Sequence, residues 1–227
     1  MTHRFDHGFD KEYWERHWHQ GRTGGPGSMG SNPPIPYLVR EAGGLMPGTA
    51  LDAGCGAGAE AIWLAEQGWQ VTAVDISAEA LARAASRAAT SGAPERVRWV
   101  EADLSVWDPG TTFDLVTTAY AHPAMPQLKF YDRIAGWVAP GGTLLIVGHL
   151  HTHSAPGDGH GHGHQPPAEA SATAAAVTSR LDETAWEVVT AEERHRTLAG
   201  HGGRETPLHD VVVRATRRRA GTGGGVA

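Results

Sequence analysis

The sequence predicts an α/β protein built on a doubly wound, mostly parallel β-sheet with helices on both faces. Short apolar segments that favour strands alternate with alanine-rich segments that favour helices between residues 49 and 149. A turn with three glycines joins the first of these strands to the helix that follows. Strands that alternate with helices in this way form parallel βαβ units, which place helices on both faces of the sheet. The 227 residues suffice for one such domain.

Residues 1–44 are expected to form an N-terminal segment with an aromatic helix and a Gly/Pro-rich stretch. Four aromatic side chains recur at helical spacing within residues 10–20, namely Tyr13, Trp14, His17 and Trp18. The next stretch, GRTGGPGSMGSNPPIP, predicts a loop because Gly, Ser and Pro interrupt regular structure. Residues 36–45 favour a second short helix that ends at the glycine pair Gly43 and Gly44.

Residues 45–216 are expected to form a single domain that contains all the strands. Ser77 is placed to cap the second helix of this domain, because serine side chains accept hydrogen bonds from helix N-termini. The predicted helices span 59–67, 78–91 and 127–138. The predicted strands span 49–53, 69–75, 97–101, 113–119 and 142–149.

The C-terminal third predicts a loop, a long hairpin and a tail. Residues 149–167 are rich in His and Gly and lack an apolar pattern, which predicts a flexible loop. Residues 186–197 and 208–216 are strand-like and form an antiparallel hairpin through a turn with Gly200, Gly202 and Gly203. Residues 217–227 predict a disordered, solvated tail that begins with the three arginines Arg217, Arg218 and Arg219.

Composition and charge favour a soluble cytoplasmic protein. The chain has one cysteine and so forms no internal disulfide, which fits a reduced compartment. The longest apolar runs are too short to cross a bilayer, and the polar start does not resemble a signal peptide. The formal net charge of −6 lacks the basic character that phosphate binding needs. We therefore expect no membrane and no nucleic-acid partner.

Three aspartates follow or end successive predicted strands near the glycine turn. Asp52 directly precedes the turn, where its carboxylate could pair with a ligand ammonium. Asp75 ends the second strand and is placed to accept hydrogen bonds from ribose hydroxyls. Asp103 follows the third strand, where it could bind an adenine amino group beside the main-chain N–H of Leu104. The set suits a ligand with an amine, a ribose and an adenine but no phosphate.

Two other functions remain open on these residues. The glycine spacing also satisfies the G-x-G-x-x-A dinucleotide pattern, so an NAD-dependent oxidoreductase is one alternative. A non-catalytic metal-handling protein is the other, because imidazole is a common ligand of Zn²⁺ and Ni²⁺. No preformed metal site is predicted, since the histidines lie in a flexible stretch. They are His149, His151, His153, His160, His162 and His164.

The chain resembles class I S-adenosylmethionine-dependent methyltransferases over most of residues 45–150. The segments that carry the resemblance are LDAGCGAGAEAIWLAEQGWQVTAVDIS, EADL, FDLVTTAYAH and APGGTLLIVGH. Within that family it looks most like bacterial small-molecule enzymes of the thiopurine and tellurite type. The resemblance implies a seven-stranded sheet whose reversed last strand lies beside the fifth. It also implies S-adenosyl-L-methionine over the Gly54–Gly58 turn and an N-terminal lid across it.

The implied reaction moves a methyl group to a small-molecule O, N, S or metalloid acceptor by in-line displacement. His122, in the loop after the fourth strand, is the candidate catalytic base. Cys55 is expected to fill space at the turn rather than to act as a nucleophile. Neither the acceptor nor the oligomeric state is indicated. The predicted cofactor-binding residues are Asp52, Gly54, Gly56, Gly58, Asp75, Ile76, Asp103, Leu104, Tyr120, Trp14 and Trp18.

Overall fold

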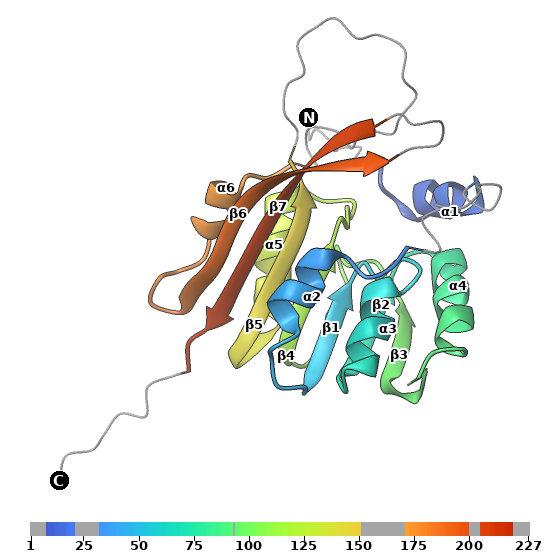
Figure 1. The fold of residues 1–227 in the computed structure, drawn as a ribbon, viewed down its shortest axis with the longest axis horizontal. Coiled ribbons are helices and arrows are strands. Elements are labelled where there is room, and N and C mark those ends of the chain that lie inside the picture. Colours follow the sequence, from blue (N-terminus) through green and yellow to red (C-terminus); the bar gives the residue numbers. More distant parts are fainter. Residues whose placement is uncertain (1–7, 21–31, 93, 151–170, 200–204, 220–227) are drawn as a thin grey trace, which may run out of the picture.

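The computed structural model describes residues 8–20, 32–92, 94–150, 171–199 and 205–219 and forms one seven-stranded sheet (Figure 1). The strand order is β3-β2-β1-β4-β5-β7-β6, in which β1 to β5 run parallel. β7 is antiparallel to both of its neighbours, as the resemblance implied. The strands are β1 Thr49–Ala53, β2 Gln70–Asp75, β3 Val97–Glu101, β4 Phe113–Ala119, β5 Val138–His149, β6 Trp186–Ala199 and β7 Glu205–Arg217.

Helices cover both faces of the sheet, which confirms the predicted doubly wound α/β fold. Helices α2, α3 and α4 lie on one face of the sheet, and α5 and α6 lie on the other (Figure 1). Each face buries its own apolar cluster, around Leu64 and Trp69 on the first and around Phe130 and Ile134 on the second. The helix bounds are α2 Pro36–Ala42, α3 Ala59–Glu66, α4 Ala78–Ala88, α5 Gln127–Ala135 and α6 Ala174–Thr178, with a 3₁₀ turn η2 at Pro94–Arg96.

The predicted aromatic helix is α1 (Lys11–Gln20), and it lies beyond the sheet near the start of α4 (Figure 1). Its Trp18 side chain is only 7% exposed and packs with Ala57 of the glycine turn and Ala80 of α4. Trp14 lies against the same small cluster. The helix is therefore held against the carboxyl ends of β1 and β2, where parallel sheets of this kind bind ligands.

Some predicted boundaries were wrong. The helix predicted to reach Val138 ends at Ala135, because Gly136 caps it and Val138 already pairs with Phe113 as part of β5. The second helix ends at Ala42 and not at residue 45. α6 was not predicted, although Thr173 caps it by accepting the N–H of Ala176.

The arginine run is not wholly a solvated tail. Arg217 is the last residue of β7, and its guanidinium donates to the carbonyl of Val138. The main-chain N–H of Arg218 donates to the carbonyl of Ala185. The predicted tail therefore begins later than residue 217.

Four predicted segments lie wholly or mostly outside the described residues. They are the first loop, the loop at 149–167, the hairpin turn with Gly200, Gly202 and Gly203, and residues 220–227.

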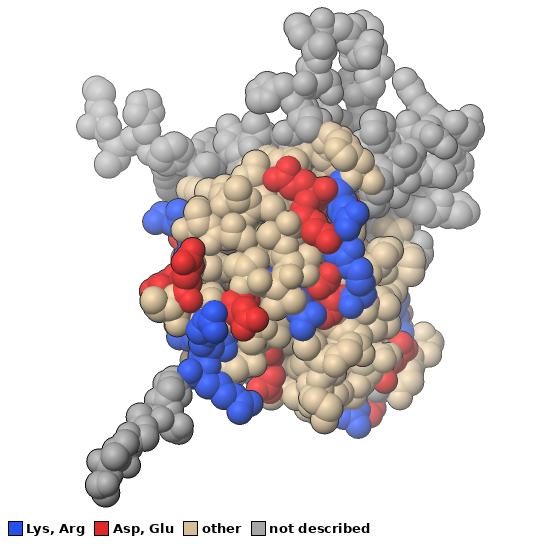
Figure 2. Space-filling model, turned by 60° about the vertical axis from the view of Figure 1, so that its left-hand side comes forward, with Lys and Arg blue, Asp and Glu red and all other residues tan. Residues whose placement is uncertain are grey.

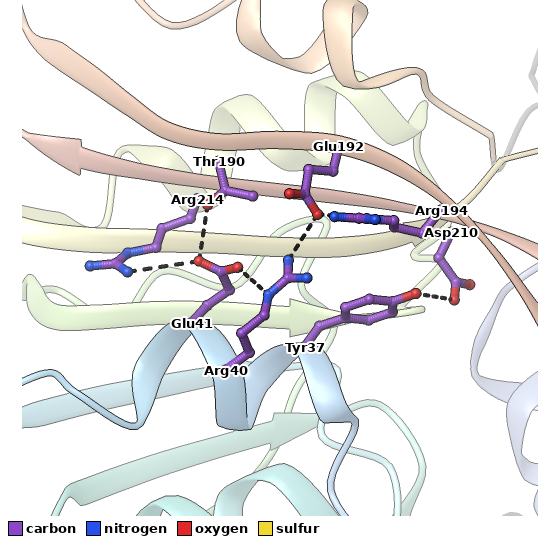
Figure 3. Close-up of polar contacts among 8 residues, drawn as sticks. All are labelled: Tyr37, Arg40, Glu41, Thr190, Glu192, Arg194, Asp210 and Arg214. Carbon is purple, nitrogen blue, oxygen red and sulfur yellow. Dashed lines mark hydrogen bonds and ion pairs between the residues drawn. The ribbon is translucent and has the colours of Figure 1, made fainter.

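A polar network fixes α2 against the C-terminal hairpin (Figure 3). The buried Glu41 carboxylate accepts from Arg40 at 2.7 Å and from Thr190 at 3.0 Å, and it lies 3.7 Å from the guanidinium of Arg214. Buried ion pairs of this kind orient the elements that carry them more than they stabilise the fold. The network places α2 against β6 and β7.

The same helix reaches the buried Asp210 of β7. The Tyr37 hydroxyl donates to the Asp210 carboxylate at 3.1 Å, as Figure 3 shows. Glu192 of β6 accepts from Arg40 and from Arg194 beside it. Among the described residues, no helix is long and apolar enough to span a membrane.

Candidate active site

The three glycines of the predicted turn all adopt left-handed backbone conformations. Their φ angles are 84° at Gly54, 50° at Gly56 and 77° at Gly58, which side chains other than glycine rarely adopt. The N–H groups of Gly54 and Cys55 both donate to the carbonyl of Val74, at 2.8 and 3.0 Å. The turn is thereby tied to the end of β2.

Two of these glycines also stand in close contacts. A Cβ on Gly54 would lie 2.3 Å from the Ala121 Cβ, and one on Gly58 would lie 2.6 Å from the Trp99 ring. Gly54 therefore couples the turn to the loop after β4, where His122 lies. Neither position can accept a larger residue without a shift of the turn or of these neighbours.

Asp75 ends β2, as predicted, and its carboxylate joins the turn to α4. It accepts the N–H of Gly56 at 2.8 Å and the N–H of Ser77 at 2.9 Å. Burial raises the pKa of Asp75, and main-chain N–H groups, including that of Ile76, oppose the rise. Ser77 caps α4 as predicted, since its hydroxyl accepts the N–H of Ala80 at 3.2 Å.

Asp52 lies beneath the turn and is 1% exposed. Within the described part of the chain, its Oδ2 atom has no hydrogen-bond partner. Burial raises the pKa of Asp52 well above its ordinary value, and the nearby Glu60 and Asp75 carboxylates raise it further. Two further carboxylates near this buried oxygen favour a positively charged partner for it. A ligand ammonium fits this requirement, whereas a pyrophosphate does not.

Glu60 was not predicted as a site residue. It lies in the first turn of α3 and accepts the N–H of Ile35 at 3.0 Å. Burial raises its pKa as well. The acidic residue two positions after Gly58 could have indicated it, because carboxylates are favourable at helix N-termini.

Asp103 and Leu104 lie beside Asp75, as their positions after β3 predicted. The N–H of Ala102 donates to the carbonyl of Asp75 at 3.0 Å, which brings the two segments together. The Asp103 carboxylate accepts the N–H of Ser105 at 2.8 Å, so it also stabilises its own turn. The Leu104 side chain is buried in the core.

The N-terminal helix is attached to the helix that follows Asp75. Glu15 accepts the N–H of Ala78 at 2.8 Å and the hydroxyl of Ser77 at 3.1 Å. Arg83 donates to the carbonyl of Trp18 at 2.7 Å and lies over the Trp18 ring. A Cβ on Gly56 would lie 3.1 Å from the same ring, so Trp18 covers the glycine turn.

Trp14 connects the same helix to the loop after β4. Its Nε1–H donates to the carbonyl of His122 at 3.2 Å, and the Phe9 ring lies 5.7 Å from the His122 ring. α1 thus contacts both the glycine turn and the loop of the candidate base. Glu15 and Phe9 were not predicted, because their contacts join residues far apart in the sequence.

His122 is 7% exposed and is surrounded by polar and aromatic partners. Its Nδ1 atom lies 3.1 Å from the Oε1 atom of Gln127, and its ring lies 5.8 Å from the His149 ring. Tyr120 stacks on His149 with ring centroids 4.4 Å apart. Tyr120 has a φ of 56°, a conformation that non-glycine residues adopt at a cost and often at functional sites.

His149, one of the six histidines of the predicted loop, is the last residue of β5 and faces Asp210 across the β5–β7 ladder. The other five lie outside the described residues. Cys55 is buried, and burial together with the neighbouring carboxylates raises the pKa of its thiol. A protonated, buried thiol suits the packing role that was predicted.

Comparison with known proteins agrees with this geometry. Residues 50–142 match the family described as "Methyltransferase domain". The chain is 29% identical over 135 residues to the probable thiol methyltransferase 2 of Arabidopsis thaliana, a match that covers 58% of this chain and 59% of that protein. The chain spans about half the length of the curated relatives it matches.

Two solved structures share the fold over nearly the whole chain. One, described as "Conversion of a Disulfide Bond into a Thioacetal Group during Echinomycin Biosynthesis", has a TM-score of 0.66 at 21% identity and covers 93% of both chains. The other is the 1,6-didemethyltoxoflavin-N1-methyltransferase of Burkholderia thailandensis with bound 1,6-didemethyltoxoflavin and S-adenosylhomocysteine. It has a TM-score of 0.59 at 24% identity and covers 92% of this chain and 87% of that one. Residues 50–142 therefore match a methyltransferase domain, and the resemblance of the chain to class I S-adenosylmethionine-dependent methyltransferases is confirmed.

Proposed function

We propose that the protein transfers a methyl group from S-adenosyl-L-methionine to a small-molecule acceptor by in-line displacement. The observation that carries this proposal is the buried Oδ2 atom of Asp52, which has no partner among the described residues and lies near Glu60 and Asp75. The cofactor brings an ammonium and a sulfonium to such a site. A nicotinamide dinucleotide would bring a pyrophosphate, which these carboxylates repel. Nothing in the comparisons favours the oxidoreductase or the metal-handling alternative.

Each half of the cofactor has residues suited to hold it. The main chain of the glycine turn and Asp52 would hold the methionine part, and Asp75 beside Ile76 would accept from the ribose hydroxyls. Asp103 and the N–H of Leu104 would bind the adenine. Aromatic walls come from α1 and the β4 loop, where a ring can stabilise a cation by on the order of 0.5–2 kcal/mol. Those wall residues are Trp14, Trp18 and Tyr120.

The protein's own contribution is orientation, exclusion of water and removal of a proton. The sulfonium, when bound, supplies a methyl group that is already reactive. Holding two reactants in line contributes roughly 7–11 kcal/mol to such a reaction. α1 covers the turn through Trp18 and contacts the β4 loop through Trp14, so it acts as a lid. His122 acts as the base toward the acceptor.

The proposed acceptor is a small molecule, in the cytoplasm, and not a nucleic acid. The thiol methyltransferase relative makes a thiol the first acceptor to test. On the face shown in Figure 2, acidic and basic side chains are interspersed and no broad basic area is seen. Non-specific binding to a phosphate backbone requires such an area. The free thiol of Cys55 suits a reduced compartment.

A methyl-transfer screen tests the proposal. The purified protein is incubated with S-adenosylmethionine labelled in the methyl group and, in turn, with a thiol, a phenol, a primary amine and a metalloid oxyanion. We expect labelled product from at least one acceptor, and at least a tenfold loss of product with Asp75→Ala. Exposed Glu66→Ala serves as the matched control and keeps the wild-type rate. No product from any acceptor, together with reduction of NAD in the presence of alcohols, would support the oxidoreductase instead.

A further inference from the structure

Gln127, the first residue of α5, contacts the Nδ1 side of the His122 ring. Its side chain is 4% exposed, so no bulk water shares its hydrogen bonds. Its Nε2 atom donates to the carbonyl of Ala121 at 3.0 Å, and its Oε1 atom lies 3.1 Å from the Nδ1 atom of His122. A single buried amide therefore contacts both the main chain of the β4 loop and the imidazole that the loop carries.

These two contacts allow only one orientation of the amide. A main-chain carbonyl accepts hydrogen bonds and never donates them, so the NH₂ group must face Ala121 and the oxygen must face His122. An amide oxygen is likewise only an acceptor. The Nδ1 atom of His122 must therefore carry a proton. In the neutral imidazole, the Nε2 atom then carries the lone pair.

The surroundings hold this arrangement in place. Tyr131 lies one turn along α5 and is buried. Burial raises its pKa to about 12, although a hydrogen bond with Gln127 acts in the opposite direction. Its hydroxyl stays neutral at every physiological pH. On the other side, Trp14 donates to the carbonyl of His122 and fixes the main chain of that residue. Buried and fully bonded amides of this kind rigidify the groups around them.

We propose that Gln127 is a positioning residue that keeps His122 in the tautomer whose Nε2 atom can accept a proton, so that the acceptor is a protic group. The inference rests on the proposed methyltransferase function. Thiols, phenols and amines are protic acceptors, whereas thiocyanate and similar anions have no proton to lose. The acceptor X–H forms an X–CH₃ bond as the S–CH₃ bond of the sulfonium breaks, and the sulfur keeps that electron pair in S-adenosylhomocysteine. The proton of X–H passes to Nε2, and the resulting imidazolium, still bound to Gln127 through Nδ1–H, returns that proton to solvent.

Several other titratable groups surround the imidazole. The His149 ring faces it from β5 at 5.8 Å, and the Tyr120 ring stacks on His149. Asp210 lies opposite His149 on β7 and accepts from the Tyr37 hydroxyl. From the N-terminal segment the nearest rings are those of Phe9 and Trp14, which do not titrate. Any pH dependence of His122 therefore has to be compared with that of His149.

The tautomer can be measured directly by ¹⁵N NMR of protein labelled in the histidine rings. The signals of His122 are assigned by their loss in His122→Asn. We expect the wild-type pattern of a protonated Nδ1 and an unprotonated Nε2. Gln127→Leu should shift the ring toward the Nε2-protonated form, whereas Gln127→Glu keeps an oxygen at Nδ1, retains the tautomer and raises the pKa of His122. A wild-type ring protonated on Nε2, or a tautomer unchanged in Gln127→Leu, would overturn the proposal.

Kinetic measurements on the same variants distinguish a loss of catalysis from a loss of folding. Exposed Gln70→Leu on β2 is the matched control, and S-adenosylhomocysteine affinity serves as the test of folding. The acceptors are 2-mercaptoethanol, phenol and ethylamine as protic probes and thiocyanate as an anion without a proton. We expect Gln127→Leu to lose at least tenfold in kcat on the protic probe that the wild-type protein methylates. The affinity of this variant for S-adenosylhomocysteine should be unchanged. In Gln127→Glu most of the kcat should be restored at higher pH. Turnover of thiocyanate alone would overturn the acceptor class. Absence of all turnover with the NMR result intact would instead contradict the proposed function.

Discussion

Glu15 of the N-terminal helix accepts the main-chain N–H of Ala78 at 2.8 Å, so a carboxylate from α1 caps the helix that follows the candidate ribose-binding strand. The contact spans 63 positions in the sequence. Because carboxylates are favourable at helix N-termini, it attaches the proposed lid to the rigid part of the site. The position of α1 and the integrity of the cofactor site are therefore linked.

Glu15→Ala should loosen the proposed lid. Loss of a helix cap costs about 1 kcal/mol, so we expect a decrease of that size in the free energy of unfolding. Hydrogen exchange of the main-chain amides in α1 should become faster, because the helix loses its hydrogen bonds to Ser77 and Ala78 at the start of α4. The matched control is Glu12→Ala, which removes a carboxylate that pairs with Arg16 within the same helix. Equal exchange rates in the two variants would refute the link.

Asp52→Asn should stabilise the protein without ligand and weaken cofactor binding. Burial raises the pKa of Asp52 above its ordinary value of 3.8, so the folded state binds this proton more tightly than the unfolded state. The free energy of unfolding therefore falls as pH rises from 3.8 through the raised pKa of Asp52. Above that raised pKa the loss of stability caused by the ionised carboxylate is complete. At pH 7 the asparagine variant should have the higher Tm and a flatter pH dependence.

The same variant should bind S-adenosylhomocysteine at least tenfold more weakly, because a hydrogen bond to a charged group contributes about 1.5–3 kcal/mol. Calorimetry and thermal melts at several pH values give both quantities. Exposed Glu66→Gln is the control and should change neither. A lower Tm together with wild-type affinity would show that Asp52 stabilises the fold and has no ligand role.

Gly54→Ala should disturb both the turn and the β4 loop. The added Cβ would lie 2.3 Å from Ala121, at a φ of 84°. A left-handed non-glycine residue costs about 1–2 kcal/mol, and overpacking adds about 1–3 kcal/mol. We expect a loss of roughly 2–5 kcal/mol in a denaturant titration. Gly92→Ala, where nothing lies within 4 Å, should cost little, and similar losses in the two variants would argue against the contact.

His122→Ala should remove the base and leave the cofactor site intact. General base catalysis contributes typically about 10²–10⁴-fold, so kcat should fall within that range while the Kd of S-adenosylhomocysteine stays within about twofold. The pH–rate profile should lose its acid limb, because the group that must be unprotonated is gone. A variant that keeps the wild-type kcat at every pH would exclude His122 from catalysis.

The regular part of the fold could be predicted because its signals are local. β1, the glycine turn and α3 follow from apolar residues, left-handed glycines and alanines within one short segment, and the Ser77 cap lies next to its helix. Val138 was placed in a helix because the helical pattern continues up to it. Its pairing with Phe113 depends on a strand 25 positions earlier, which local periodicity does not report.

The parts of the candidate site that could be predicted are likewise those with a local signal in the sequence. The positions of Asp52, Asp75 and Asp103 follow from the rule that parallel strands end at one edge of the sheet. The contacts of Glu15 and Phe9 depend on how α1 docks, and the Gln127 contact depends on how α5 packs under the β4 loop. Packing of elements that are distant along the chain leaves no local pattern in the sequence.

The most direct test of the methyltransferase assignment is a calorimetric titration of the full chain with S-adenosylhomocysteine and, in a separate cell, with NAD. We predict one equivalent of S-adenosylhomocysteine bound per chain, at least tenfold weaker binding in Asp75→Ala, and no heat from NAD. Binding of NAD with no heat from S-adenosylhomocysteine would contradict the assignment.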